Sequence, residues 1–503
     1  MKRISVTIIS HLKDHHFYQH FKNIWFLTWW FPLICLLFIS EELCAQTTQV
    51  TNALESIKHG PPSPKQRQVI SKLTHPFQEE VEACRDCHPD EVEGFKNTHM
   101  SNAMSPPLLS KVIENFSPKK STVIHEKTGV GYRAYIDDIG RWWQDEFDPK
   151  GDYLRSVEVK YLIGSGNHTR SYIGEVDGEL IELPLTWYSA TDKRPGLWDM
   201  SPGYQRKNHF RFERPIKGDC LFCHNDLGKI NPNKLAGVVG QLPSGITCRR
   251  CHGSGQAHID TRLNGLENLE GKRDPTIYNS RYESIERQHQ LCEQCHLSGE
   301  ARALLPKQSW DTYDPRMPLD EYLRIYAFPI KQDQANPLGV NQAFGIASHV
   351  ERMKLSECAK HSSTFTCTTC HNPHQPDESS TYQNACLSCH SNEKRDHNEQ
   401  ILTCETSHQE GNQNKFCFEC HMNQSGTNDI PHVKMTDHWI RRTLVSSNEL
   451  KEATYESELE SLLPPLKPKL KSYEDGLIGL AYADLVRFNR RSDLTGKALQ
   501  LLV

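Results

Sequence analysis

The chain has 503 residues, enough for about three domains, but only 37% of them are hydrophobic and 9% are aromatic. This composition excludes a collagen-like, coiled-coil or polytopic membrane protein. The 58 basic and 63 acidic residues give a net charge of −5, so the chain lacks the basic excess that nucleic-acid binding requires.

Residues 1–45 are predicted to form a signal peptide or a membrane anchor. Lys2, Arg3, Lys13 and Lys22 are followed by an uncharged apolar run at 24–40, IWFLTWWFPLICLLFIS, which is at the lower length limit for a membrane-spanning helix. Cleavage after Ala45 and retention as an anchor both stay open. Either way the body is expected to be periplasmic or otherwise exported, with membrane association possible through 24–40. Residues 46–80 are polar and contain proline, which predicts a linker.

One pattern accounts for 14 of the 18 cysteines: C-x-x-C-H, repeated seven times. Random shuffling of this composition would produce roughly 0.03 copies, so the pattern reflects a chemical requirement. The seven motifs, numbered in chain order, are Cys84-Cys87-His88, Cys220-Cys223-His224, Cys248-Cys251-His252, Cys292-Cys295-His296, Cys367-Cys370-His371, Cys386-Cys389-His390 and Cys417-Cys420-His421.

The spacing suits covalent haem attachment. Two thiols three residues apart can each add to a vinyl group of one porphyrin, and the adjacent histidine can then bind the iron. Zinc sites or redox-active thiol pairs would explain the cysteines but not the histidine that follows each pair. The sequence therefore predicts seven covalently attached haem c groups.

The 131 residues between His88 and Cys220 are predicted to form a β-containing insertion at 89–219. Alternating β-branched and aromatic residues indicate strands at 131–136, 171–176 and 179–185. The last two flank Asp177-Gly178, a pair favoured in tight hairpin turns. We expect a small β-hairpin subdomain near 130–190.

The remaining motifs are densely packed, because six of them share the 202 residues from Cys220 to His421. No ordinary apolar core fits about 34 residues per motif, so haem faces are expected to supply the core and the apo-chain to be largely unfolded. The predicted fold class is mainly α and irregular, with a multihaem cytochrome c domain at 81–445 wrapped around a haem stack. The tail at 446–503 is rich in leucine and predicted to be helical.

Several segments resemble a known family. These are GSGNHTRSYIGEVDGELIELPLTWY at 164–188, SPGYQR at 201–206, CLFCHN at 220–225, GITCRRCHGSGQAH at 245–258, SSTFTCTTCHNPH at 362–374 and CFECHMNQSGTNDIPHVKMTDHWIRR at 417–442. They are similar to bacterial multihaem c-type cytochromes with C-terminal tetratricopeptide repeats, which are related to the cytochrome c-prime and hydroxylamine-oxidoreductase-like multihaem group. The tail looks like the start of the repeat region, possibly incomplete, although no full 34-residue repeat consensus can be laid on it.

The resemblance implies that most haems have two axial histidines. Each histidine assigned as a second axial ligand could instead lie at the surface or pair with a haem propionate. Met100 and Met422 are alternative axial ligands, but packing is the favoured role for both. His289, His349 and His361 are further candidates for distal ligands, and we call them the reserve residues. By match to the family motifs, the expected distal ligands are His99, His168, His258, His374, His408, His432 and His438.

Cys358 and Cys404 lie outside the motifs. Cys404 begins a C-x-x-S-H sequence that ends at His408, which would allow an eighth, singly tethered haem. The favoured alternatives leave His408 as a distal ligand and Cys404 either uninvolved or in a disulfide with Cys358.

Two functions compete. The first is an electron carrier that connects unidentified redox partner proteins, with the helical tail as a possible docking surface for a partner. Haem propionates would take the holoprotein to a charge of about −13, which favours positive or neutral partner faces. The second is a multihaem oxidoreductase that acts on a small nitrogen or sulfur compound at one open haem. The chain lacks the C-x-x-C-K variant of common nitrite-reducing haems and has enough histidines to ligate every iron, which favours the carrier.

Overall fold

The computed structural model describes residues 78–226, 242, 245–264, 273–297, 299–332, 344–390, 416–442 and 454–503. The predicted leader, nearly all of the predicted linker, Cys404 and His408 lie outside these ranges. Within them, no helix combines the length and apolar character needed to cross a bilayer.

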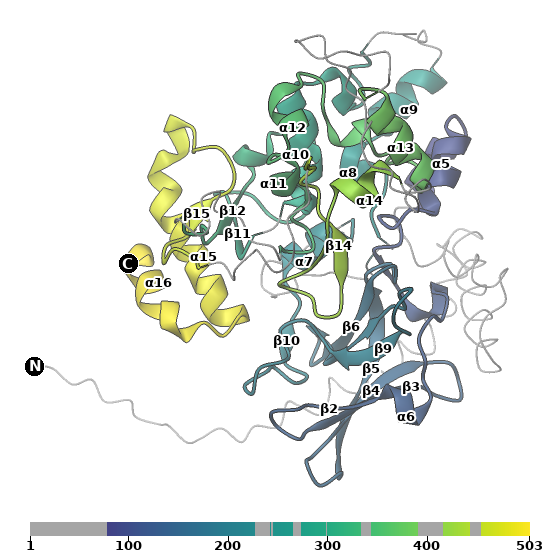
Figure 1. The fold of residues 1–503 in the computed structure, drawn as a ribbon, viewed down its shortest axis with the longest axis vertical. Coiled ribbons are helices and arrows are strands. Elements are labelled where there is room, and N and C mark those ends of the chain that lie inside the picture. Colours follow the sequence, from purple (N-terminus) through teal and green to yellow (C-terminus); the bar gives the residue numbers. More distant parts are fainter. Residues whose placement is uncertain are drawn as a thin grey trace, which may run out of the picture. The chain divides into compact units, whose positions relative to one another are not determined.

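The largest element is an antiparallel sheet of ten strands between motifs 1 and 2 (Figure 1). Its main path runs β10-β7-β6-β5-β4-β3-β2, with β1 added on β5, and β8 pairing with both β6 and β9. The strands are β1 (Met104–Ser105), β2 (Thr122–Ile124), β3 (Gly131–Ile136), β4 (Trp142–Phe147), β5 (Tyr153–Ile163), β6 (Thr169–Val176), β7 (Glu179–Glu182), β8 (Leu185–Tyr188), β9 (Leu197–Met200) and β10 (Arg214–Pro215).

The hairpin predicted around Asp177-Gly178 is confirmed. Val176 at the end of β6 pairs with Glu179 at the start of β7. Asp177 and Gly178 have φ angles of 52° and 76°, the positive values that a two-residue turn of type I′ requires. The predicted strand at 131–136 is also found, as β3.

The prediction of a mainly α and irregular fold is wrong, because this sheet is far larger than the expected small hairpin subdomain. It has a buried core of its own, in which aromatic rings from several strands pack together. Tyr172 lies 5.1 Å from Trp198 between ring centres, and Trp187 lies 5.7 Å from Trp198. Only three strands were predicted. Five of the seven others have two to four residues, but β4 and the eleven-residue β5 were also missed.

The motif-bearing region contains short helices joined by irregular segments, but it also contains strands that the sequence did not predict (Figure 1). A two-stranded sheet, β13 (Gln424–Gly426) with β14 (Lys434–Thr436), follows motif 7. The helices are α4 (Gln78–Arg85), α5 (Pro89–Lys96), α7 (Gly218–His224), α8 (Arg249–His252), α9 (Gln256–Leu263), α10 (Ile285–His296), α11 (His349–Met353), α12 (Glu357–His361), α13 (Ser379–Leu387) and α14 (Cys417–His421).

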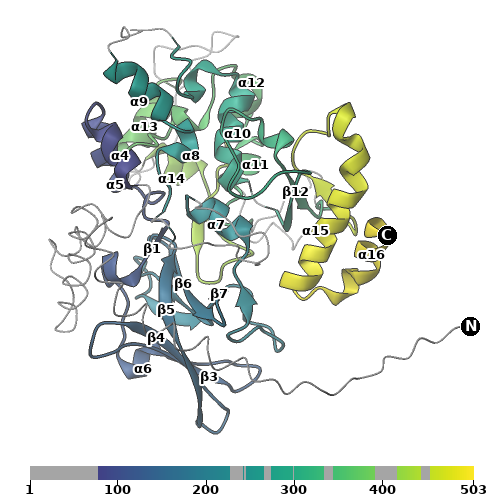
Figure 2. The same ribbon diagram turned by 180° about the vertical axis from the view of Figure 1, so that it is seen from behind.

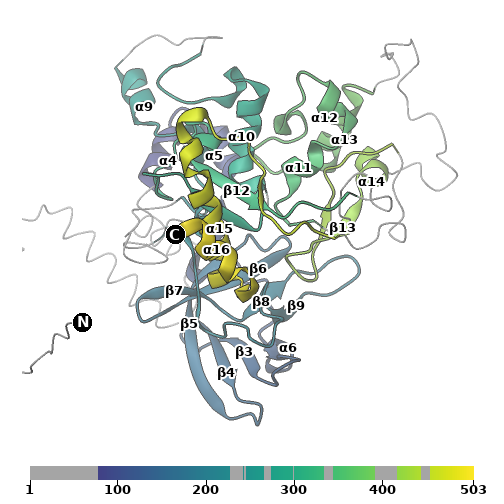
Figure 3. The same ribbon diagram turned by 90° about the vertical axis from the view of Figure 1, so that its left-hand side faces the viewer.

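The C-terminal part contains the helix pair α15 (Glu474–Phe488) and α16 (Thr495–Leu502). It also contributes β15 (Glu460–Ser461) to a sheet with β12 (Leu323–Ala327) and β11 (Ala301–Leu304). Figure 2 shows α15 beside this sheet, and Figure 3 shows α15 and α16 next to each other. A buried cluster that includes Ala303, Tyr326 and Leu485 joins the helices to the sheet. The predicted helical tail thus packs on residues that lie between motifs 4 and 5.

Candidate haem sites

A single helical turn closes the motifs. The backbone amide of the motif histidine donates to the carbonyl of the first motif cysteine in motifs 1, 3, 5 and 6, at distances of 2.8 to 3.0 Å. Because residues three and four apart share one face of such a turn, both thiols and the imidazole point to the same side. This local geometry suits one porphyrin edge per motif.

Three motif histidines each have a second histidine ring near them. The ring centres of His88 and His258 are 6.4 Å apart, with an interplanar angle of 28°. His371 and His438 are separated by 6.2 Å at 25°. In the third pair, His252 and His374, the separation is 5.9 Å and the angle is 10°.

These separations can be compared with the space that an iron needs. Each ligating nitrogen lies about 2 Å from its metal and the ring centre about 1 Å behind it, so two axial imidazoles have centres about 6 Å apart. The three pairs have this spacing, and each joins one motif histidine to one predicted distal histidine. The residues therefore fit a six-coordinate haem iron.

A fourth pair is closer together. The rings of His296, in motif 4, and His349 have centres 4.9 Å apart and planes that cross at 87°. Their Nδ1 atoms are 3.3 Å apart. On its other side His349 contacts His438, with 4.6 Å between ring centres. His296, His349, His438 and His371 thus form a continuous row, which we call the imidazole row.

Burial favours the neutral form of three members of the imidazole row. Burial, and next the charges of the neighbouring imidazoles, lower the pKa of His296 to about 4 and the pKa values of His349 and His438 to about 3. A neutral imidazole has the free lone pair that metal binding requires. The lowered pKa values of His296, His349 and His438 therefore favour the protonation state that ligation needs.

Many of the motif and distal histidines have the Nδ1 atom engaged by an oxygen. Such a contact fixes the ring orientation and the tautomer and leaves Nε2 for a metal, which is the usual arrangement around metal-bound histidine. The contacts are His252 to the Tyr278 carbonyl at 2.9 Å, His421 to the Arg441 carbonyl at 2.8 Å, His371 to Asp377 at 2.9 Å, His258 to Asp274 at 2.9 Å and His438 to the Thr436 carbonyl at 3.1 Å.

The other predicted distal residues are placed differently. His99 and His168 lie near each other, and burial lowers the pKa of both. His432 is directed away from the motif histidines, since its Nε2 is 2.6 Å from an Asp199 carboxylate oxygen and its ring packs against Tyr188. The reserve residue His361 is exposed and contacts Glu357 at 3.1 Å.

Thiol contacts connect one motif to another. The paired thiols are within hydrogen-bond reach and join motifs 1 and 3, 2 and 4, 4 and 5, and 6 and 7. Cys370 of motif 5 is also close enough to Cys386 of motif 6 to act on it electrostatically, as Cys251 of motif 3 is to Cys292 of motif 4. All seven motifs therefore belong to one connected set. The contacting pairs are Cys84 with Cys248, Cys223 with Cys295, Cys292 with Cys367, and Cys386 with Cys417.

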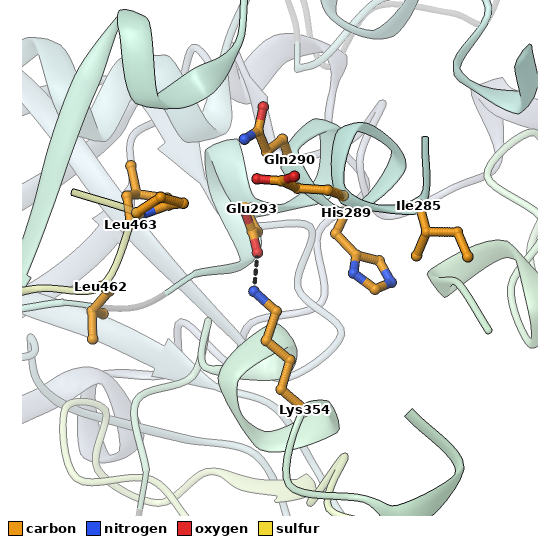
Figure 4. Close-up of a pocket in the computed structure, with 9 residues that line it drawn as sticks. Ile285, His289, Gln290, Glu293, Lys354, Leu462 and Leu463 are labelled. Carbon is orange, nitrogen blue, oxygen red and sulfur yellow. Dashed lines mark hydrogen bonds and ion pairs between the residues drawn. The ribbon is translucent and has the colours of Figure 1, made fainter. Parts of the chain in front are cut away.

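A pocket lies beside motif 4 (Figure 4). Lys354 and Glu293 form an ion pair of 2.6 Å on one side of it, and Leu462 and Leu463 line another side. His289, a reserve residue, also lines the pocket, and its Nε2 is buried with no hydrogen-bond partner in the described part of the chain. Sequence reasoning missed this pocket because its walls come from distant segments.

No sequence pattern marks the residues that hydrogen-bond to the histidines or add to their number. Asp274 and Asp377 were not singled out, and nothing in their spacing marks them. His349 was only a reserve, since no motif surrounds it. These residues become recognisable once the fold brings them beside the motif and distal histidines.

One solved structure is similar to this chain at low sequence identity. No protein-family model matches the chain, and no curated protein matches it. A solved structure described as the outer cell wall cytochrome OcwA is 14% identical, with a TM-score of 0.40, and the match covers 84% of this chain and 99% of that chain.

Proposed function

We propose that this protein is an exported c-type cytochrome that carries electrons between redox partners through seven covalently bound haems with two axial histidines each. The observation that carries this proposal is the set of three histidine pairs, each with one motif histidine, at separations of 5.9 to 6.4 Å. Zinc sites or redox-active thiols would need no second imidazole at that distance.

The roles of the residues follow from this proposal. The 14 motif cysteines would tether the haems, the seven motif histidines would each ligate one iron, and the distal histidines would supply the second imidazole. Bound haem supplies one-electron chemistry at low potential when both axial ligands are histidine. The fold brings the cysteines of different motifs next to one another, so haems tethered there would lie close together, which favours transfer from one site to the next.

Further parts of the proposal concern the location and the partners. Residues 24–40 would direct export to the periplasm or beyond, and would anchor the protein to the membrane if they are retained. The α15–α16 pair would begin a tetratricopeptide-like region that docks a partner. The negative charge of the holoprotein would favour donors and acceptors with positive or neutral faces.

Haem stoichiometry provides the first test. The mass of the denatured holoprotein should exceed that of the polypeptide by seven haems, all resistant to acid-acetone extraction. Six would show that one motif is unused, and eight would indicate a haem at Cys404. Extractable haem, or zinc in place of haem, would overturn the proposal.

Ligand binding and electron transfer provide the second test. With every iron ligated by two histidines, cyanide, nitrite and hydroxylamine should leave the ferric spectrum unchanged. The dithionite-reduced protein should lose its electrons rapidly to a soluble c-type acceptor. A protein that is never reoxidised by such an acceptor would not be a carrier.

One observation supports the alternative, an oxidoreductase that acts on a small nitrogen or sulfur compound at an open haem. Within the described residues, no ring contact pairs His224 of motif 2 with a second histidine, as is also true of His390 and His421, and the half-buried Arg302 lies 3.0 Å from the Cys223 sulfur. A cationic group beside an open iron would suit an anionic substrate. A spectral change in about one seventh of the haem on adding nitrite, together with turnover of nitrite, would favour this function.

A further inference from the structure

We infer that His349 is the sixth ligand of the haem iron at motif 4, opposite His296. This assignment rests on the proposed function, because it presupposes a haem attached to Cys292 and Cys295. It differs from the ligand set expected from the sequence, in which His432 was a distal ligand and His349 was not.

The first argument is position. His349 is the histidine whose ring contacts His296 most closely among the described residues, with 4.9 Å between ring centres. The other side of His349 faces His438. The imidazole row therefore has room for two irons, one between His296 and His349 and one between His438 and His371. The Nδ1 atoms of the first pair now face each other at 3.3 Å, so iron binding would require the rings to separate by about 1 Å and to turn their Nε2 atoms toward the metal.

The second argument is how firmly His349 is held. It is the first residue of α11, and one turn later Arg352 forms a two-bonded ion pair with Asp437, at 2.8 and 2.5 Å. Asp437 directly precedes His438. The Ser356 hydroxyl donates a hydrogen bond to the His438 carbonyl at 3.2 Å and accepts one from the backbone amide of Ile440 at 2.8 Å. Both distal histidines of the row are thus positioned by one buried cluster.

The third argument concerns His432. Its Nε2, the nitrogen that an iron would need, contacts the carboxylate of Asp199 on β9 at 2.6 Å. The His432 side chain is 35% exposed to solvent. Its ring also packs against Tyr188 rather than against a motif histidine. His432 therefore connects the segment after motif 7 to the ten-stranded sheet.

The angle between the ring planes adds a spectroscopic signature. The planes of His296 and His349 cross at 87°, whereas the three other pairs have angles of 10° to 28°. Crossed axial imidazoles give a ferric low-spin haem with a strongly anisotropic electron paramagnetic resonance signal, and near-parallel ones give ordinary rhombic signals. The haem at motif 4 should therefore be distinguishable from those at motifs 1, 3 and 5.

The test compares His349→Ala with the matched control His432→Ala in the exported, haem-loaded protein. His349→Ala should convert about one seventh of the ferric haem to high spin and remove the strongly anisotropic signal, while seven haems remain attached. His432→Ala should stay fully low-spin. A fully low-spin His349→Ala protein, or a high-spin haem in His432→Ala, would overturn the assignment.

A second variant covers the case in which His349→Ala fails to mature. His349→Met should keep the haem low-spin and add the red absorption band of a ferric haem ligated by methionine. No such band in a fully loaded protein would also overturn the assignment. Peptide mapping of Cys292 and Cys295 separates the two hypotheses, because unmodified thiols there would contradict the proposed function itself.

Discussion

Arg352 and Asp437 form an ion pair that is almost completely buried, with side-chain exposures of 7% and 1%. Arg441 contacts the same carboxylate at 3.2 Å. The guanidinium groups of Arg352 and Arg441 also lie over the Trp439 ring, 5.4 and 4.4 Å from its centre. One carboxylate thus joins α11 to the segment that follows β14, and so holds the two distal histidines of the imidazole row in contact.

Asp437→Asn should therefore be strongly destabilising. Removing the charge leaves two buried guanidinium groups without a compensating carboxylate, which costs about 3 kcal/mol in the free energy of unfolding. Denaturant unfolding of the ferric holoprotein measures this loss. The control is Asp493→Asn, which breaks the exposed pair with Arg491 and should change the stability very little, because solvent screens surface ion pairs. Equal losses in the two variants would contradict the role given to the buried cluster.

Gly245 should not tolerate a side chain. It has a φ angle of 56°, and a Cβ at this position would overlap the backbone carbonyl oxygen of Ser101. Gly140 has a φ angle of 84° but no atom within 4 Å of such a Cβ. Gly140→Ala should cost about 1 kcal/mol from its backbone conformation alone, and Gly245→Ala about 2 kcal/mol more. Thermal unfolding of the two variants gives the difference, and similar melting temperatures would rule out the clash.

The ten-stranded sheet should lose stability in mild acid through His209. Burial, followed by the charges of His125 and Arg211, lowers the pKa of His209 below its ordinary value of 6.5. The Arg206 carbonyl and Glu146 raise this pKa, but their effect is smaller. Below pH 6.5 the unfolded chain therefore binds a proton that the folded chain does not. The contribution of His209 to the free energy of unfolding is therefore fully present above this pH and decreases below it, by at most about 1.4 kcal/mol per pH unit.

Replacement of His209 tests this mechanism. His209→Gln retains a group that can bond to the Tyr132 hydroxyl, which lies 2.9 Å from Nε2 in the native protein, but it cannot titrate. Unfolding free energies at about pH 7.5 and pH 5.5 should differ less in the variant than in the native protein. An unchanged difference would assign the acid sensitivity to other groups.

The paired distal histidines should each control the spin state of one haem. His258→Ala and His374→Ala should each convert about one seventh of the haem to high spin without loss of covalent haem, since the thioether bonds do not depend on the axial ligand. His361→Ala serves as a control because that side chain is exposed. Absorption spectra of the ferric proteins provide the measurement. Low-spin spectra from both distal variants would contradict these pairings.

The sequence by itself determined the local features of this protein. Each C-x-x-C-H motif is closed by one helical turn, and the Asp177-Gly178 hairpin depends on two adjacent residues with positive φ angles, so both follow from short-range geometry. The leucine-rich tail likewise predicts helices, and α15 and α16 are found there. In these cases the chemical information lies within a few neighbouring residues.

Only the tertiary structure decided which distant residues meet. The size of the sheet was missed because short strands gain their stability from cross-strand partners rather than from their own sequence. His258 matched a family motif, but its pairing with His88 could not be read from spacing. His349 had no motif at all, and it became a candidate ligand because the buried Arg352–Asp437 pair holds it between His296 and His438. Axial ligation depends on convergence in space, and that convergence depends on packing and buried charge far along the chain.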